Sequence, residues 1–549
     1  MADPVLTVAE LLRPTFTHIA GGVDSDPVVR RSDRADAQVN GSLALAKALG
    51  KTPREVAQMV LDAVDLSKVC SATEIAGPGF INVTFSNEFL ASELAAAAAD
   101  VRLGVRNAPA KLKVVVDYSA PNVAKEMHVG HLRSTVIGDA LVRMLGFVGH
   151  SVVRENHIGD WGTPFGMLIE HLIDLGETEA ANELSVGDLD SFYRQARTKF
   201  DSNDEFKERA RARVVLLQGG DDETLRMWKL LVGESTRYFD KVYQTLGVLL
   251  TADDLMGESA YNPLLAQVVD RLRASGLIEI SDGAEVVFPD GFLNRENEPL
   301  PLIIRKTDGG YNYATSDLAC VIDRVERIGA NVVLYVVGSP QAQHLEMVAV
   351  VSRKAGWVPE STELTHVAFG NVLGADRKIL KSRSGEVVKL DALLTESVER
   401  AADAVKEKNA ELPAAQQAEV ARQIGIGAVK YADLSTDRIK DYVFDWERML
   451  AFEGNTSPYL QYAHARICSI FRRTGVDRAE VRGITPTLGH SAERALTVRL
   501  LQFDTAVWDT LDKYSPHRLC TYLYELASEF SSFYEHCPIL RADSEEQKM

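Results

Sequence analysis

Two histidines in the stretch DYSAPNVAKEMHVGHLRST, residues 117–135, are the residues whose types and spacing most directly indicate chemistry. His128 and His131 are three positions apart, so both rings lie on one side if a helix begins here. A helix start exposes unpaired N–H groups and a partial positive charge, and Gly130 lets a ligand approach the backbone. The pattern predicts a phosphate site at which both imidazoles donate hydrogen bonds. For an isolated pair with this spacing, surface or metal-binding histidines are the alternative.

The surrounding sequence predicts the elements that position this pair. From about residue 111, strand-like and helical patterns alternate, as in LKVVVDYS, LRSTVIGDALVRMLGFVG, HSVVREN and TPFGMLIEHLIDLG. That alternation predicts βαβ units and a parallel sheet. Ligands of open α/β sheets bind at the carboxyl ends of the strands, where the histidines follow a strand. Residues 176–250 interrupt the rhythm with long polar helical patterns, which indicates an insertion.

Three domains are expected. Residues 1–108 combine helical spacing with two strand-like runs around a Gly-Pro-Gly turn, which is typical of an α+β domain. Residues 109–390 form the α/β domain with its insertion. Residues 391–549 have almost no strand signal and predict an all-helical domain.

Composition limits the classes of function. The formal charge of −18 argues against non-specific binding to nucleic acid or membranes, although a local basic patch could still bind one RNA. The five cysteines are scattered without a CxxC pair, which argues against a zinc knuckle or a disulfide framework and fits a reducing cytosol. No apolar run is long enough to span a membrane, and the N-terminus lacks the apolar core of a signal peptide. We expect a cytoplasmic monomer.

Several motifs in order resemble one enzyme family. HVGH between a strand and a helix is similar to the His-x-Gly-His signature of class I aminoacyl-tRNA synthetases. The longer stretch around it resembles arginyl-tRNA synthetases, as do NHIGDWGTPFG, YATSDLA, HVAFGNVLG, LKSRSGEVVKL and RLCTYLYELASEFSSFYEHC. ADAQVN and AGPGFINV are similar to the N-terminal domain of that family. The resemblance implies a Rossmann-like, doubly wound parallel sheet as catalytic domain, an α+β N-terminal domain that contacts tRNA, and an all-α anticodon-binding bundle at about residues 455–549.

The activity implied is arginine–tRNA ligation. The arginine carboxylate attacks the α-phosphorus of ATP, and a hydroxyl of the terminal adenosine of tRNA(Arg) then attacks the activated carbonyl. Because the substrate supplies the nucleophile, the protein needs only to position the reactants and stabilise phosphate charge. The alternatives are a synthetase-like paralogue that binds tRNA without aminoacylation, or another nucleotidyltransferase with a His-x-Gly-His motif.

The resemblance assigns ATP contacts to His128, Gly130 and His131, and phosphate neutralisation to Lys125. The loop at residues 375–386 stands where the family has its Lys-Met-Ser-Lys-Ser motif, but departs from that pattern. Its expected ATP-binding residues are Lys381, Ser382 and Arg383. Gly338 and His344, which follow a strand, are expected at the sugar and base of ATP. We expect ATP phosphates to hold Mg²⁺, with no protein metal ligand.

Selecting arginine requires carboxylates, because a guanidinium group is a planar array of hydrogen-bond donors. Asp117, at the end of the first strand, and Asp317, one helical turn after Tyr313, are the candidates. A lone aspartate is more often a helix cap or a surface charge. The resemblance points to the same residues and adds Asn122, for the α-amino or the carboxylate end of the substrate, and Gln341 as a further arginine-binding residue.

Overall fold

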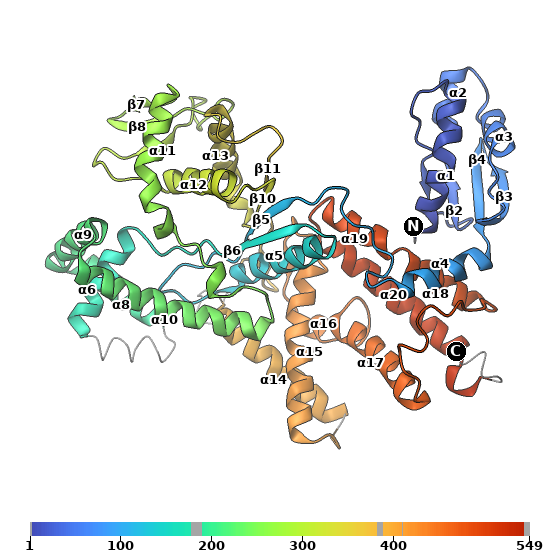
Figure 1. Cartoon of the computed structure of the whole chain (residues 1–549). Coiled ribbons are helices and arrows are strands. Elements are labelled where there is room, and N and C mark those ends of the chain that lie inside the picture. Colours follow the sequence, from blue (N-terminus) through green and yellow to red (C-terminus); the bar gives the residue numbers. More distant parts are fainter. Residues whose placement is uncertain (1–2, 177–188, 381–387, 409, 543–549) are drawn as a thin grey trace. The chain divides into compact units, whose positions relative to one another are not determined.

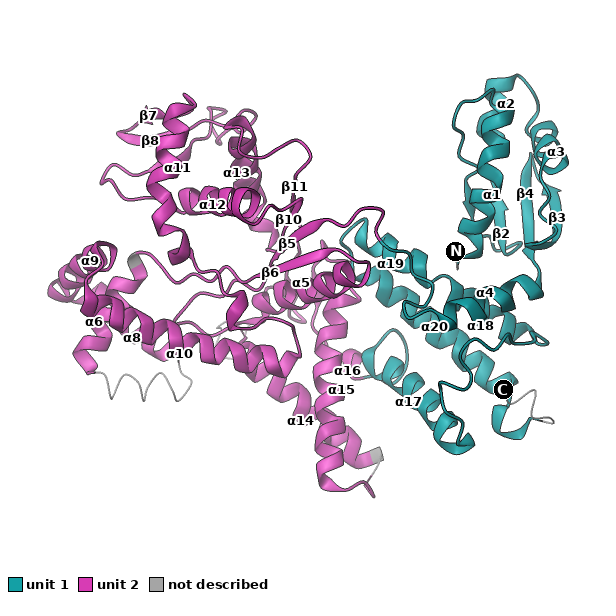
Figure 2. Ribbon diagram, in the orientation of Figure 1, with its two compact units in different colours: residues 1–107, 451–549 teal, residues 108–450 magenta. Residues whose placement is uncertain are grey.

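The computed structural model describes residues 3–176, 189–380, 388–408 and 410–542. The chain forms two compact units, Met1–Asn107 with Ala451–Met549, and Ala108–Leu450 (Figure 2). The three domains expected from the sequence, residues 1–108, 109–390 and 391–549, remain a prediction, because the two compact units divide the chain differently. None of the helices in the described ranges is long and apolar enough to cross a membrane.

A four-stranded parallel sheet forms the centre of the second unit (Figure 1). Its strands, in spatial order, are β11 (Glu363–His366), β10 (Val332–Tyr335), β5 (Lys113–Asp117) and β6 (Ser151–Glu155). The pairing registers align the last residues of all four strands, His366, Tyr335, Asp117 and Glu155. The predicted parallel α/β sheet is confirmed, and its carboxyl edge is a continuous row.

Helices connect these strands. They are α5 (Val129–Phe147) after β5, α6 (Thr163–Leu175) after β6, α12 (Tyr313–Ile322) before β10, and α13 (Ala342–Lys354) after β10. Helix α5 is buried along most of its length. A Cβ atom at Gly138 would lie 2.4 Å from Tyr118, so only glycine lets α5 pack this closely on the turn after β5. The middle of α5 therefore packs tightly against the turn after β5.

The predicted insertion is helical within the described residues. It contains α8 (Leu189–Ser202), α9 (Asp204–Gly219) and α10 (Asp222–Leu246), which pack with α6. The chain returns to the sheet through α11 (Asn262–Ala274) and a small antiparallel sheet. That sheet comprises β7 (Glu279–Ser281), β8 (Ala284–Val287) and β9 (Leu302–Arg305).

The second unit ends in α14 (Leu390–Lys408), α15 (Ala414–Leu434) and α16 (Trp446–Met449), with the short parallel pair β12 (Val372–Leu373) and β13 (Tyr442–Val443). A buried ion pair between Arg133 of α5 and Asp433 of α15 joins these helices to the sheet. Both side chains are at most 1% exposed, so removing one partner would leave an uncompensated buried charge.

The first unit combines the N-terminal module with C-terminal helices. The module's sheet has the order β1 (Val29–Arg30), β2 (Ala37–Val39), β4 (Phe80–Phe85), β3 (Cys70–Ala76), and its helices are α1 (Pro4–Ile19), α2 (Ser42–Leu49), α3 (Pro53–Ala63) and α4 (Asn87–Ala99). The C-terminal helices are α17 (Ser457–Thr474), α18 (Ser491–Leu501), α19 (Phe503–Leu511) and α20 (His517–His536). Arg494 of α18 forms an ion pair with Asp36 of the module.

Candidate active site

The chain leaves β5 through a turn with left-handed backbone at residues other than glycine. Ser119, Ala120 and Ala124 have φ angles of 76°, 49° and 59°. Each of their N–H groups donates to a side-chain oxygen of a different segment, at 2.8–3.0 Å. The acceptors are Ser134 in α5, Asn156 after β6 and Ser235 in α10. Such conformations cost about 1–3 kcal/mol each and persist only where the surroundings impose them, as they do here.

His128 and His131 form a reciprocal cap at the start of α5. Nδ1 of His128 accepts a hydrogen bond from Gly130 N–H at 3.1 Å, and Nδ1 of His131 accepts one from His128 N–H at 3.0 Å. The ring centroids are 3.9 Å apart. Because Nδ1 is an acceptor in both rings, each neutral imidazole carries its proton on Nε2. Both rings can therefore donate an Nε2–H bond to a phosphate.

The protonation state of the pair agrees with this arrangement. Burial, the neighbouring His128 and Lys125 lower the pKa of His131 to about 3. Desolvation also lowers the pKa of His128, with Lys125 adding to the effect against Asp190. At neutral pH both rings are thus neutral donors, as the hydrogen bonds at Nδ1 require.

Lys125 and the segment after the irregular loop meet beside the histidines. The Lys125 ammonium lies 4.4 Å from the ring centroid of Tyr193 in α8. Lys389 forms an ion pair with Glu126 at 3.0 Å, and its ammonium is 3.9 Å from Asp190 of α8. The insertion therefore contacts both basic residues.

Backbone hydrogen bonds fix the same segment against the histidine motif. Val129 N–H donates to the Val388 carbonyl at 3.1 Å, and Leu390 N–H donates to the Met127 carbonyl at 2.8 Å. The carboxyl end of the predicted ATP-binding loop thus pairs with the start of α5. The expected loop residues, Lys381, Ser382 and Arg383, lie outside the described residues.

Asp117 lies in a buried internal ion pair. Its Oδ2 atom is 2.7 Å from Arg324, whose Nε atom is 2.6 Å from Glu155 at the end of β6. Arg324 is 1% exposed and also stacks on Tyr335, with 5.0 Å from its guanidinium carbon to the ring centroid. A guanidinium group of the protein thus already contacts Oδ2 of Asp117, and the contact expected between Asp117 and the substrate stays a prediction.

Tyr313, Asp317 and His344 form one group. Tyr313 and Asp317 lie in the first turns of α12, and His344 lies in α13. Nε2 of His344 is 2.5 Å from Oδ2 of Asp317, and the rings of His344 and Tyr313 are 4.8 Å apart. The sequence grouped His344 with the ATP residues, whereas the structure pairs it with the residues expected to bind arginine. The physical reason is that α13 packs on α12, which turns His344 toward Asp317.

A second carboxylate, Glu258, belongs to this group and was not expected. Burial raises the pKa of Glu258 to about 7, and the charges of Asp160 and Asp317 add to the effect while His157 opposes it. Among the described residues, no hydrogen-bond partner is found for its carboxylate. Asp160 is itself held by Ser259 N–H and Oγ, at 2.9 and 2.7 Å. Glu258 is therefore a half-buried carboxyl group whose ionised form a cationic ligand would stabilise.

The remaining predicted residues lie at turns beyond the sheet edge. Asn122 is exposed and forms a β-bridge with Gly159, where a Cβ atom would lie 2.3 Å from Oδ1 of Asn122. Gly338 follows β10, and Ser339 N–H donates to the Phe369 carbonyl at 3.0 Å. Gln341 is exposed at the start of α13. A side chain at position 159 would therefore displace the Asn122 side chain from its present position.

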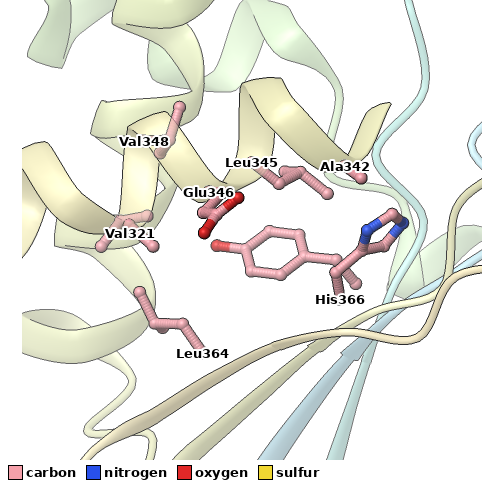
Figure 3. A pocket seen from close by; sticks show the side chains of 9 residues that line it. Val321, Ala342, Leu345, Glu346, Val348, Leu364 and His366 are labelled. Atoms are coloured by element: carbon pink, nitrogen blue, oxygen red, sulfur yellow. The ribbon is translucent and has the colours of Figure 1, made fainter. Parts of the chain in front are cut away.

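A cavity of about 290 Å³ lies between α12, α13, β10 and β11 (Figure 3). Its walls are mostly apolar, with Glu346 and His366 among the lining residues. His366 is held by a contact of 3.0 Å between Nε2 and the Val337 carbonyl. None of the residues predicted to bind ATP or arginine lines this cavity, so it is separate from the group around Asp317.

Comparison with models of known protein families shows to which family the chain belongs. Residues 93–446 match the family described as tRNA synthetases class I (R), catalytic domain. Residues 7–85 match the arginyl tRNA synthetase N terminal domain, and residues 460–549 match the DALR anticodon binding domain. The chain belongs to the arginyl-tRNA synthetase family.

Individual relatives of this family agree over the whole chain. A curated arginine–tRNA ligase of Thermobifida fusca (strain YX) is 52% identical over 548 residues, covering 100% of this chain and 95% of that protein. The arginine–tRNA ligase of Escherichia coli (strain K12) is 50% identical over 542 residues, covering 98% and 94%. The solved arginyl-tRNA synthetase of Plasmodium falciparum has a TM-score of 0.83 at 27% identity, covering 99% and 94%. That of Thermus thermophilus, with a TM-score of 0.81 at 23% identity, covers 99% and 95% and supports the fold.

Two residues of this synthetase site had no usable signal in the sequence. Glu258 lies in MGESAYN, between the insertion and the next helix, with no periodic pattern to place it. Arg324 follows an apolar helical run and looks like an ordinary exposed charge, although it is fully buried.

Proposed function

We propose that this synthetase is an arginine–tRNA ligase that activates L-arginine with ATP and transfers it to the 3′ end of its tRNA. Membership of the family makes the chain an aminoacyl-tRNA ligase. The observation that carries the choice of amino acid is the similarity to curated arginine–tRNA ligases at 52% and 50% identity over nearly the whole chain. The site is consistent with it, because Asp317 and the half-buried Glu258, whose charges interact, offer acceptor oxygens to the planar donors of a guanidinium group.

The phosphates of ATP bind at the start of α5 in this proposal. His128 and His131 donate Nε2–H bonds to ATP phosphates, and the N-terminal N–H groups of α5 add a partial positive charge. Lys125 neutralises part of the phosphate charge. Lys381, Ser382 and Arg383 remain proposed contacts, and Gly338 leaves room for the sugar. These groups stabilise the charge that develops when the arginine carboxylate attacks the α-phosphorus and pyrophosphate leaves.

Arginine binds to the groups around Asp317 in this proposal. Asp317 and Glu258 accept hydrogen bonds from the guanidinium group, and Tyr313 covers its plane. His344 fixes the Asp317 carboxylate through its hydrogen bond. Asn122 and Gln341 bind the α-amino end, which leaves the substrate carboxylate toward α5.

Magnesium is proposed to bind through ATP. Mg²⁺ prefers oxygen ligands in octahedral geometry. Beside the histidines, the described carboxylates of Glu126 and Asp190 already contact Lys389, so the protein offers nitrogen donors rather than free oxygens there. The phosphates supply the oxygen ligands, and the ion neutralises the leaving pyrophosphate.

The tRNA is proposed to contact α17 and the N-terminal module. Tyr462 in α17 is 54% exposed, and the Arg466 guanidinium lies 5.4 Å from its ring centroid. An exposed aromatic ring beside a guanidinium group, as here, is suited to stacking on unpaired RNA bases. We also propose that the enzyme is a monomer in the cytoplasm. The five free cysteines fit a reducing compartment.

The test is arginine-dependent exchange of pyrophosphate into ATP, measured with and without tRNA(Arg). We expect exchange with arginine and cognate tRNA, and none with citrulline, which has the shape of arginine without its charge. Exchange with another amino acid, or none with arginine and intact tRNA, would refute the proposal. A paralogue that only binds tRNA would give the second result.

A further inference from the structure

Three metal-ligand types meet beside the Asp317 group. One ring nitrogen of His157, a carboxylate oxygen of Asp317 and Sγ of Cys320 all lie within 4.8 Å of one another. Asp317 and Cys320 are three residues apart in α12 and share a face of that helix. His157 follows β6, so two elements contribute to the cluster.

We propose that His157, Asp317 and Cys320 bind a thiophilic divalent ion, Zn²⁺ or Cd²⁺, and that this ion competes with arginine. The site itself stands on the three side chains, whereas the competition rests on the proposed function. The ion is an inhibitor in this proposal, because it occupies a carboxylate that arginine needs.

The spacing is close to that of a tetrahedral site. Bonds of about 2.0–2.3 Å to nitrogen, oxygen and sulfur separate the ligand atoms of a tetrahedral zinc ion by roughly 3.3–3.7 Å. Sγ of Cys320 is 3.9 Å from Nδ1 of His157, already near this value. The widest separation allowed by the cluster, 4.8 Å, needs a contraction of at most about 1.5 Å. Water can take the fourth position.

The ligand set selects the ion. Sulfur and imidazole nitrogen favour Zn²⁺ and Cd²⁺, whereas Mg²⁺ and Ca²⁺ prefer oxygen ligands. The magnesium that accompanies ATP is therefore not expected to bind here. Cys320 is buried, so an entering ion must displace the thiol proton into solvent and replace it as the partner of sulfur.

Neighbouring charges favour a dication. Glu258 places a half-buried carboxylate close to both Asp317 and His157. Arg324, a buried cation, is neutralised by Asp117 and Glu155. The negative charge that we propose for the guanidinium group thus serves a metal ion equally well. In the free protein Nδ1–H of His157 donates to the Met256 carbonyl at 3.1 Å and orients the ring, so an entering ion must displace this proton as well as that of the Cys320 thiol.

Co²⁺ is the probe for binding, because cobalt thiolate sites absorb light through sulfur-to-metal charge transfer. Cys468 lies 3.6 Å from His464 in α17 and could give its own signal, so all proteins carry Cys468→Ser. In this background the full-length chain is expected to bind one Co²⁺ with a charge-transfer band. Cys320→Ser should abolish the band, and the matched control Cys537→Ser should keep it.

Competition is read from the same band. Saturating arginine should raise the apparent Kd for Co²⁺ at least tenfold, whereas ATP should leave it unchanged. In aminoacylation assays, Zn²⁺ should raise the KM for arginine without lowering kcat, and Cys320→Ser should remove this effect. Circular dichroism checks the fold of Cys320→Ser, and His157→Gln is the second variant that should lose the band.

The outcomes separate the two proposals. A band that survives Cys320→Ser, or no band in a protein that charges tRNA with arginine, overturns the metal site. A band lost in Cys320→Ser but insensitive to arginine overturns the competition. If the protein does not charge arginine but shows the Cys320-dependent band, the site stands and the proposed function fails.

Discussion

Proton release on arginine binding is the sharpest test of the carboxylate pair. Glu258 has a pKa of about 7, so it is about half protonated in the free enzyme at pH 7. A guanidinium group beside it stabilises the ionised form and lowers this pKa. Binding at pH 7 should therefore release about 0.5 proton per arginine, rising to about 0.9 at pH 6 and falling to about 0.1 at pH 8.

The affinity follows from the same linkage. Below pH 7 the arginine Kd should rise toward tenfold per pH unit, because a proton must leave Glu258 before the ion pair forms. Glu258→Gln keeps the shape and removes the charge. A charge-assisted hydrogen bond contributes about 1.5–3 kcal/mol, so this variant should bind arginine about 10- to 150-fold more weakly at pH 8.

The assay is isothermal titration calorimetry with arginine in two buffers of different ionisation enthalpy at pH 6, 7 and 8. The difference in proton release between wild type and Glu258→Gln isolates this carboxylate from His344 and other neighbours. Glu279→Gln, an exposed glutamate of β7, is the control and should behave as wild type. Equal proton release in wild type and Glu258→Gln would show that Glu258 does not contact the guanidinium group.

Three further outcomes follow from the same structure. His128→Ser can still cap α5 but cannot reach a phosphate, so we expect pyrophosphate exchange to slow about 10²- to 10³-fold with the arginine Kd unchanged. A higher Kd for arginine would contradict the proposed role of His128 in phosphate binding. Arg324→Met should lower the free energy of unfolding in urea by about 3–5 kcal/mol, because Asp117 and Glu155 stay buried without a counter-charge. The control Arg400→Met removes one side of an ion pair with Glu396 that is exposed on both sides, and should cost less than about 1 kcal/mol. Because the pKa of His131 is lowered to about 3 in the folded chain, the unfolded chain binds more protons between about pH 3 and 6.5. The free energy of unfolding should therefore fall by about 1.4 kcal/mol for each pH unit below 6.5 from this group alone. His131→Gln can keep the helix cap and should reduce that slope in urea titrations at pH 5 to 7.

The sheet and the start of α5 could be predicted because their signals are local. Alternating strand and helix patterns placed β5, α5 and β6 in order, and parallel strands bring their carboxyl ends to one edge. The spacing of His128 and His131 then placed both rings at the start of a helix, whereas their reciprocal cap was found only in the structure. Such features depend on neighbours in the sequence, so one sequence is enough to read them.

The arginine side of the site depends on contacts far apart in the sequence. Arg324 lies 207 residues after Asp117 in the sequence, and no local sequence pattern predicts that the two residues form an ion pair. His344 is bound to Asp317 only because α13 packs beside α12. Glu258 becomes a candidate only when burial and nearby charges raise its pKa. These assignments require the three-dimensional structure, because each one is set by packing rather than by spacing.

The two halves of the site differ in how they are supported. The carboxyl groups of the protein that we propose for arginine are positioned by helices packed on the sheet. The groups that we propose for phosphate depend on the short backbone pairing of residues 388–390 with the histidine motif. Lys389 reinforces that pairing through Glu126 and approaches Asp190 in the insertion. A shift of α8 would therefore change the position of the loop end before it changed the Asp317 group. It follows that ligands acting on the insertion should affect the use of ATP more than the binding of arginine.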